Sequence, residues 1–182
     1  DIAMLRKERE YTNVLLVEQP NTDFGYTIAR QFLFDVYHLL FLKELQKSKD
    51  LTLSAIASKA IKEVSYHQRF SSDWIRRLGD GTEESHEKIQ DAIDALWTYT
   101  DELFYETEVE QQMINEGIAV NISELKQQYY DEVTEVLEEA TLRVPESKWF
   151  LKGGKEGVHT EHLGYLLSDL QYMQRTYPNM EW

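Results

Sequence analysis

An aspartate and a histidine interrupt the most apolar stretch of this sequence. Between Gln31 and Lys43, only Asp35 and His38 break a run that is apolar on every helical face. Because these two residues are three apart, they share one face of a helix. Carboxylate-bridged di-metal proteins present an acid and an imidazole into a helical bundle in this way, normally as Glu-x-x-His on two helices.

A second acid and histidine, Glu63 and His67, lie four apart at the edge of another apolar stripe. With Asp35 and His38 they form the candidate ligand set of a metal site. A di-iron bundle takes a carboxylate from each of two helices and an acid-x-x-His pair from each of the other two. Glu63 and His67 are four residues apart rather than three, so their side chains are oriented differently from those of an acid-x-x-His pair. The set therefore resembles a di-iron site with parts missing.

The next predicted helix supplies no better match. Asp94 provides the acid, but Trp97 stands where the imidazole should be, and an indole has no lone pair for a metal. Two interpretations therefore stay open. The favoured one is a residual polar cluster that bonds to protein groups, with no catalytic, cofactor-binding or metal residue in this chain. The alternative is a ferritin-like di-metal oxidase or oxygenase with its own site.

Composition narrows the class of protein. The chain has 182 residues, 42% of them hydrophobic, and no cysteine, which excludes disulfides, thiolate catalysis and iron–sulfur clusters. Its net charge of −14 and the absence of a basic stripe disfavour a nucleic-acid partner. No stretch resembles a signal peptide or a membrane span, so we expect a cytoplasmic protein. The length fits one domain, over residues 1–182.

Hydrophobic periodicity predicts an all-α fold. The main helices are expected at residues 24–47, 51–79, 83–106, 121–142 and 160–177. The first is apolar all round and should be the central, buried helix. The predicted core contains apolar residues from four of these helices: Phe32, Val36, Leu39, Leu40, Ile61, Val64, Ile93, Leu96, Leu166 and Leu170.

Two further constellations have ordinary explanations beside chemical ones. The loop Gly153-Gly154-Lys155 before a helix could hold an anion such as phosphate, although it lacks the P-loop spacing and more simply is a flexible helix entry. His159, Glu161 and His162 are not expected to share one ion, since neighbouring helical residues diverge.

Several longer runs carry a resemblance to a known family. They are 15–21 (LLVEQPN), 27–32 (TIARQF), 62–67 (KEVSYH), 77–82 (RLGDGT), 139–142 (EATL), and 153–155 (GGK) through 159–164 (HTEHLG). In this order, and over essentially the whole chain, they resemble the C subunits of bacterial phenylacetyl-CoA 1,2-epoxidases, also called ring-1,2-phenylacetyl-CoA oxygenases.

The resemblance implies a ferritin-like helical bundle and a structural role in aerobic phenylacetate degradation. It implies a catalytic A subunit as partner, which would hold the di-iron centre, and contact with the reductase is a further expectation. Members of this family also carry a helical hairpin before the segment that begins here at Asp1. Without that hairpin an apolar stripe would be open, and the chain alone would be expected to form a homo-oligomer.

Overall fold

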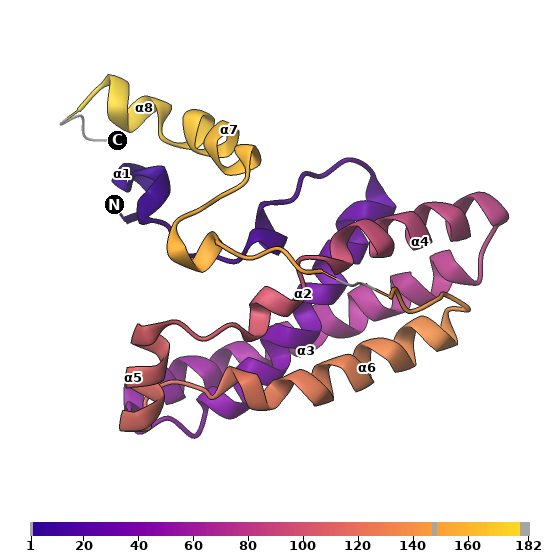
Figure 1. Cartoon of the computed structure of the whole chain (residues 1–182), viewed down its shortest axis with the longest axis horizontal. Helices are drawn as coiled ribbons and strands as arrows, with labels where there is room; N and C mark the ends of the chain where they lie inside the picture. The colour runs from indigo at the N-terminus through magenta and orange to yellow at the C-terminus, as the bar shows by residue number, and fades with distance from the viewer. Residues whose placement is uncertain (1, 147–148, 179–182) are drawn as a thin grey trace.

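The computed structural model describes residues 2–146 and 149–178, and within these residues every regular element is helical. Four long helices form a bundle: α2 (Phe24–Leu45), α3 (Leu51–Gly79), α4 (Glu83–Trp97) and α6 (Lys126–Glu139) (Figure 1). The short helix α5 (Glu108–Glu116) lies at one end of the bundle. Short 3₁₀ turns occur at Leu15–Glu18, Asp101–Phe104, Ile122–Leu125 and Gly154–Glu156. The all-α, ferritin-like architecture expected from the sequence is confirmed.

Helix α2 is the centre of the bundle, as its all-round apolar character predicts. It packs against α3, α4 and α6, so most of its circumference is covered. Its buried apolar side chains are Ile28, Ala29, Phe32, Leu33, Val36, Leu39, Leu40, Leu42 and Leu45. Asp35 is buried among them.

Side-chain caps mark the starts of α3 and α4. The Asp50 carboxylate accepts hydrogen bonds from the N–H groups of Thr52 and Leu53, and α3 starts at the next residue. The Thr82 hydroxyl accepts from the Ser85 N–H at the start of α4. Each cap satisfies donors that have no partner within the helix.

Helix α4 ends earlier than the sequence predicts. Periodicity indicated a helix to residue 106, but α4 stops at Trp97 and a 3₁₀ turn follows. The backbone N–H and the hydroxyl of Thr100 both donate to the Trp97 carbonyl, at 3.1 and 2.8 Å, so the chain changes there to the tighter i→i−3 bonding of a 3₁₀ turn. The turn then directs the Glu102 side chain inward, where it is buried.

The C-terminal helix is broken in two and leaves the bundle. Helices α7 (Glu161–Leu170) and α8 (Tyr172–Thr176) meet at Gln171 and pack with α1 (Ile2–Leu5) and the turn Glu8–Glu10. Residues 2–10 and 161–177, which contain these four segments, are called the arm below and project from the bundle (Figure 1).

The arm overturns part of the predicted core. Leu166 and Leu170 were expected to be buried in the bundle and are exposed, because the arm turns only Leu163 and Leu167 inward. Ile61 is half-buried against the core, and the other seven predicted core residues are buried.

Among the described residues, no helix combines the length and apolarity that crossing a bilayer requires.

Candidate functional site

The Asp35 carboxylate is held by protein donors on both oxygens. Asp35 lies on α2 and is only 1% exposed. The Gln31 side-chain amide donates to Oδ1 at 2.6 Å, and the Ser71 hydroxyl of α3 donates to Oδ2 at 2.9 Å. Asp35 thus links the central helix to α3 through a satisfied buried group.

The electrostatics of this cluster follow from burial. Burial raises the pKa of Asp35, and the hydrogen bonds from Gln31 and Ser71 and the charges of His67 and His38 only partly oppose the rise. Burial lowers the pKa of His38; the Asp35 charge acts against this shift and the His67 charge adds to it. At His38 and Asp35 alike, burial favours the neutral form.

The structure brings together only part of the predicted ligand set. Asp35, His38 and His67 are close enough to influence one another, but the His67 side chain is largely exposed. Glu63, one turn before His67 on α3, is exposed too. Helix α4 contributes nothing to the cluster: the Asp94 carboxylate pairs with Arg143 at 2.7 Å.

These residues do not fit a di-iron centre. A bundle site needs carboxylates from several helices that converge on one point, whereas Asp35 contacts Gln31 and Ser71 and the Glu63 side chain is exposed on α3. Across residues 2–146 and 149–178, no group of three or more His, Asp or Glu side chains is arranged to hold an ion. Trp97 is buried against Tyr130, with ring centroids 5.6 Å apart, where an imidazole ligand would be needed.

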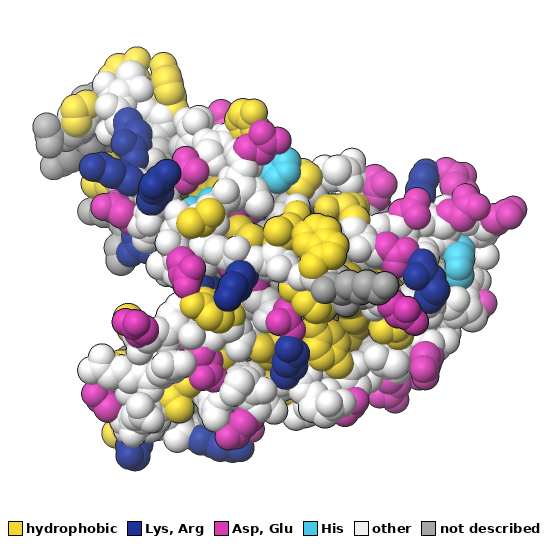
Figure 2. All heavy atoms as spheres, in the orientation of Figure 1, with side chains coloured by type: hydrophobic (Ala, Val, Ile, Leu, Met, Phe, Trp, Pro, Cys, Tyr) yellow, Lys and Arg dark blue, Asp and Glu magenta, His cyan; other side chains and the backbone are white. Residues whose placement is uncertain are grey.

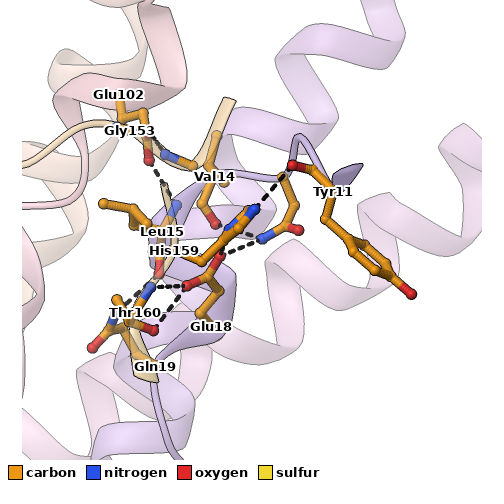
Figure 3. Close-up of polar contacts among 11 residues, drawn as sticks. Tyr11, Val14, Leu15, Glu18, Gln19, Glu102, Gly153, His159 and Thr160 are labelled. Atoms are coloured by element: carbon orange, nitrogen blue, oxygen red, sulfur yellow. Dashed lines mark hydrogen bonds and ion pairs between the residues drawn. The ribbon is translucent and has the colours of Figure 1, made fainter. Parts of the chain in front are cut away.

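A second polar cluster, which the sequence did not reveal, lies where the N-terminal segment crosses the C-terminal loop (Figure 3). The buried Glu18 carboxylate accepts four hydrogen bonds there. Asn13 and His159 contact Oε1 at 2.8 and 2.6 Å, while the N–H and hydroxyl of Thr160 both contact Oε2 at 2.8 Å. Asn13 and Thr160 supply only donors, so the Glu18 carboxyl group accepts hydrogen bonds on both of its oxygens.

His159 bridges Glu18 and Tyr11. Its Nδ1 faces Glu18, and its Nε2 lies 2.9 Å from the Tyr11 carbonyl oxygen. The Tyr11 carbonyl can only accept, so Nε2 carries a hydrogen and donates it, and one further proton lies between Nδ1 and Oε1 of Glu18. The Glu18 and His159 side chains are 1% and 0% exposed, so this pair is fully desolvated.

Glu102 closes the other side of the same junction. One carboxylate oxygen accepts from the Leu15 N–H at 2.6 Å, and the other accepts from the N–H groups of Gly153 and Gly154 at 2.7 and 2.8 Å. The carboxylate therefore ties the turn after α4 to both the N-terminal segment and the C-terminal loop (Figure 3). Together Glu18, Glu102 and His159 are called the clasp below.

The clasp explains the glycine loop. The sequence indicated that Gly153 and Gly154 could hold an anion, and the anion they hold is a carboxylate of this same chain. Gly153 has a φ of +145°, and a Cβ on Gly154 would collide with the Asn13 carbonyl oxygen. The loop is therefore an internal anchor rather than a phosphate site.

The partners of the predicted residues were only partly visible in the sequence. Gln31 lies four residues before Asp35, a helical spacing that indicates contact. Ser71 carried no comparable signal. Glu18 and His159 both fall in runs that carry the family resemblance, which was the one pointer to them.

Comparison with known proteins agrees with this architecture. A model of the family described as phenylacetic acid catabolic protein matches residues 1–182. The chain is 47% identical over 181 residues to the C subunit of 1,2-phenylacetyl-CoA epoxidase from Escherichia coli (strain K12). That match covers 100% of this chain and 73% of the relative. The chain belongs to the phenylacetic acid catabolic protein family.

Proposed function

We propose that this chain is a structural, non-catalytic subunit of a phenylacetyl-CoA epoxidase that acts in aerobic phenylacetate degradation. The observation that carries the proposal is the 47% identity to the C subunit of such an epoxidase along the whole of this chain. Its role is to support a catalytic A subunit, in which we expect the di-iron centre and the oxygen chemistry to lie.

The state of Asp35 supports the non-catalytic part of this proposal. Asp35 bonds to Gln31 and Ser71, and among the described residues it belongs to no group of three or more ligand side chains that could hold an ion. Glu63 and His67 lie at the surface of α3 rather than around a shared point in the bundle. This pattern is expected of a ferritin-like bundle that has kept its polar cluster for packing.

The proposal includes the partners and location that such a role requires. The partner is the catalytic subunit, with the reductase as a second contact, and neither a nucleic acid nor a membrane takes part. A chain of net charge −14 repels phosphate backbones, which supports the first exclusion. We propose that residues 1–182 act as one domain in the cytoplasm.

Metal analysis and complex formation test the proposal together. The protein is expressed in iron-rich medium, purified and assayed for iron, then mixed with the catalytic subunit and sized by chromatography with light scattering. We expect far less than stoichiometric iron and a stable complex. A stoichiometric di-iron centre that Asp35→Ala removes would instead make this chain a di-metal oxidase. Failure to bind the catalytic subunit would also contradict the proposal.

A further inference from the structure

The arm is held together along one side only. Leu163 and Leu167 of α7 are buried, and so is Gln171. The Gln171 side-chain amide donates to the carbonyl oxygens of Ala3 and Arg6 at 2.9 and 2.8 Å, which fastens α7 and α8 to the N-terminal segment. This side of the arm therefore already has its partner.

The remaining sides of the arm are open and carry large apolar side chains alongside the exposed Glu161 and Asp169. Six of its large side chains are between 39% and 68% exposed: Tyr165, Leu166, Leu170, Tyr172, Met173 and Tyr177. Figure 2 shows hydrophobic side chains along the outer edge of the arm, with Lys and Arg side chains beside them. Contiguous exposed patches of this kind are typical of interaction sites.

The exposed side chains occupy two directions around the helices. Leu166, Leu170, Met173 and Tyr177 follow a 4–3–4 spacing, which puts them on one side. They are called the seam below. The break at Gln171 keeps the helical path, since the Gln171 N–H bonds to Leu167 and its carbonyl accepts from Arg175. Tyr165 and Tyr172, seven apart, lie on a different side.

The exposed area of the seam distinguishes between two occupants: a second copy of this chain and a different protein with a groove. From its exposed fractions the seam offers roughly 300 Å² of apolar surface. Two seams packed together would bury about 600 Å², below the roughly 1,000 Å² that a specific interface should reach. Pairing of two copies would also leave Tyr165 and Tyr172 in water. A partner with a groove can cover both sides, which brings the buried area into the range of a specific interface.

The charge of the arm suits a close approach. Its described residues carry four cations (Arg6, Lys7, Arg9 and Arg175) and four acids (Glu8, Glu10, Glu161 and Asp169), so the arm is neutral in a chain of net charge −14. A second protein therefore meets little electrostatic repulsion here compared with the acidic remainder of the chain.

We infer that the arm inserts into an apolar groove of the catalytic subunit and is the main anchor between the two chains. This inference rests on the proposed function and adds to it the surface that binds. The anchors are the seam on one side and the tyrosine pair Tyr165 and Tyr172 on the other. Because the arm includes the N-terminal turn and α8, the partner contacts both ends of the described chain at once.

Binding measurements on two exposed double variants test the inference. One is Leu166→Glu with Met173→Glu in the seam, and the other is Tyr165→Ser with Tyr172→Ser. Leu51→Glu is the matched control, because Leu51 is a highly exposed leucine at the start of α3 in the bundle. Affinity of each full-length chain for the purified catalytic subunit is measured by calorimetry, with circular dichroism to check the fold.

We expect both double variants to bind about tenfold or more weakly, as for central interface residues, while Leu51→Glu binds like the parent. Parent-like affinity in both double variants would overturn the inference while leaving the proposed function intact. A parent chain that does not bind at all would instead overturn the proposed function. The parent chain is also tested for self-association. If it self-associates, and Leu166→Glu with Met173→Glu abolishes that self-association but leaves binding to the catalytic subunit unchanged, a second copy covers the seam and the inference is wrong.

Discussion

Glu18 and His159 are 141 residues apart in the chain and meet with Oε1 and Nδ1 only 2.6 Å apart, in a place without access to water. This contact fastens the segment that leads into α2 to the loop that leads into α7. Glu102 binds the same two segments through their backbone N–H groups. Much of the polar chemistry of the chain therefore serves to hold its two ends on the bundle.

Removal of His159 should destabilise the protein strongly. In His159→Ala the Glu18 carboxyl group stays buried without this partner, and breaking a buried pair by removing one member costs about 3–5 kcal/mol. We expect a loss of this size in urea unfolding, with faster hydrogen exchange in residues 11–18 and 158–162.

The double variant Glu18→Gln with His159→Gln serves as the control, because it removes both ionisable groups at once. It should be more stable than His159→Ala. A loss below about 1 kcal/mol in His159→Ala would contradict a buried Glu18–His159 pair that holds the two segments together.

Glu102→Gln should loosen the same junction by a different route. A glutamine offers one acceptor oxygen and an NH₂ group, and the NH₂ would face backbone N–H donors of Leu15 or of Gly153 and Gly154. Losing hydrogen bonds to a buried charge costs about 1.5–3 kcal/mol each. Limited proteolysis should cut the loop 150–158 faster in this variant.

Glu135→Gln, an exposed position on α6, provides the comparison and should behave like the parent. Equal proteolysis of the two variants would show that the Glu102 carboxylate does not hold the loop.

Asp35 should make stability depend on pH in an unusual direction. Burial raises its pKa in the folded state above the ordinary 3.8, so the folded chain binds its proton more tightly than the unfolded chain. The resulting stabilisation is complete below pH 3.8 and is lost as the pH rises through the folded pKa. The unfolding free energy of the parent, minus that of Asp35→Asn, should therefore fall as the pH rises from about 4 to 7.

The comparison is made in a background with His38→Gln and His67→Gln, so that titration of these two neighbouring imidazoles does not enter. A difference that stays constant or grows with pH would mean that the Asp35 pKa is not raised in the fold.

Local signals in the sequence accounted for most of the bundle. The cap at Asp50 and the glycine at Gly79 gave both ends of α3 correctly, and the apolar run around Asp35 identified the central helix. The end of α4 was missed because Glu102 turns away to bind amides from two distant segments, which no local pattern reveals.

The core of the C-terminal helix was predicted wrongly for a related reason. Periodicity shows that Leu166 and Leu170 share an apolar face, but it cannot show whether the same chain covers that face. Likewise, the sequence indicated that Asp35 and His38 would be buried and bonded to protein groups; Asp35 is buried with Gln31 and Ser71 as donors, the latter from another helix, and His38 is half-buried. The sequence thus indicated the polar cluster but not its partners.

Turnover by the assembled enzyme tests the central claim most directly. The chain carrying Asp35→Asn and His38→Gln is combined with the catalytic subunit and reductase, and oxidation of phenylacetyl-CoA is measured with reduced nicotinamide cofactor. If this chain is structural, turnover should stay within a few-fold of the parent complex, and the chain without the catalytic subunit should show none. Complete loss of turnover, with the complex intact by size and the fold intact by circular dichroism, would show that the chemistry runs through this chain.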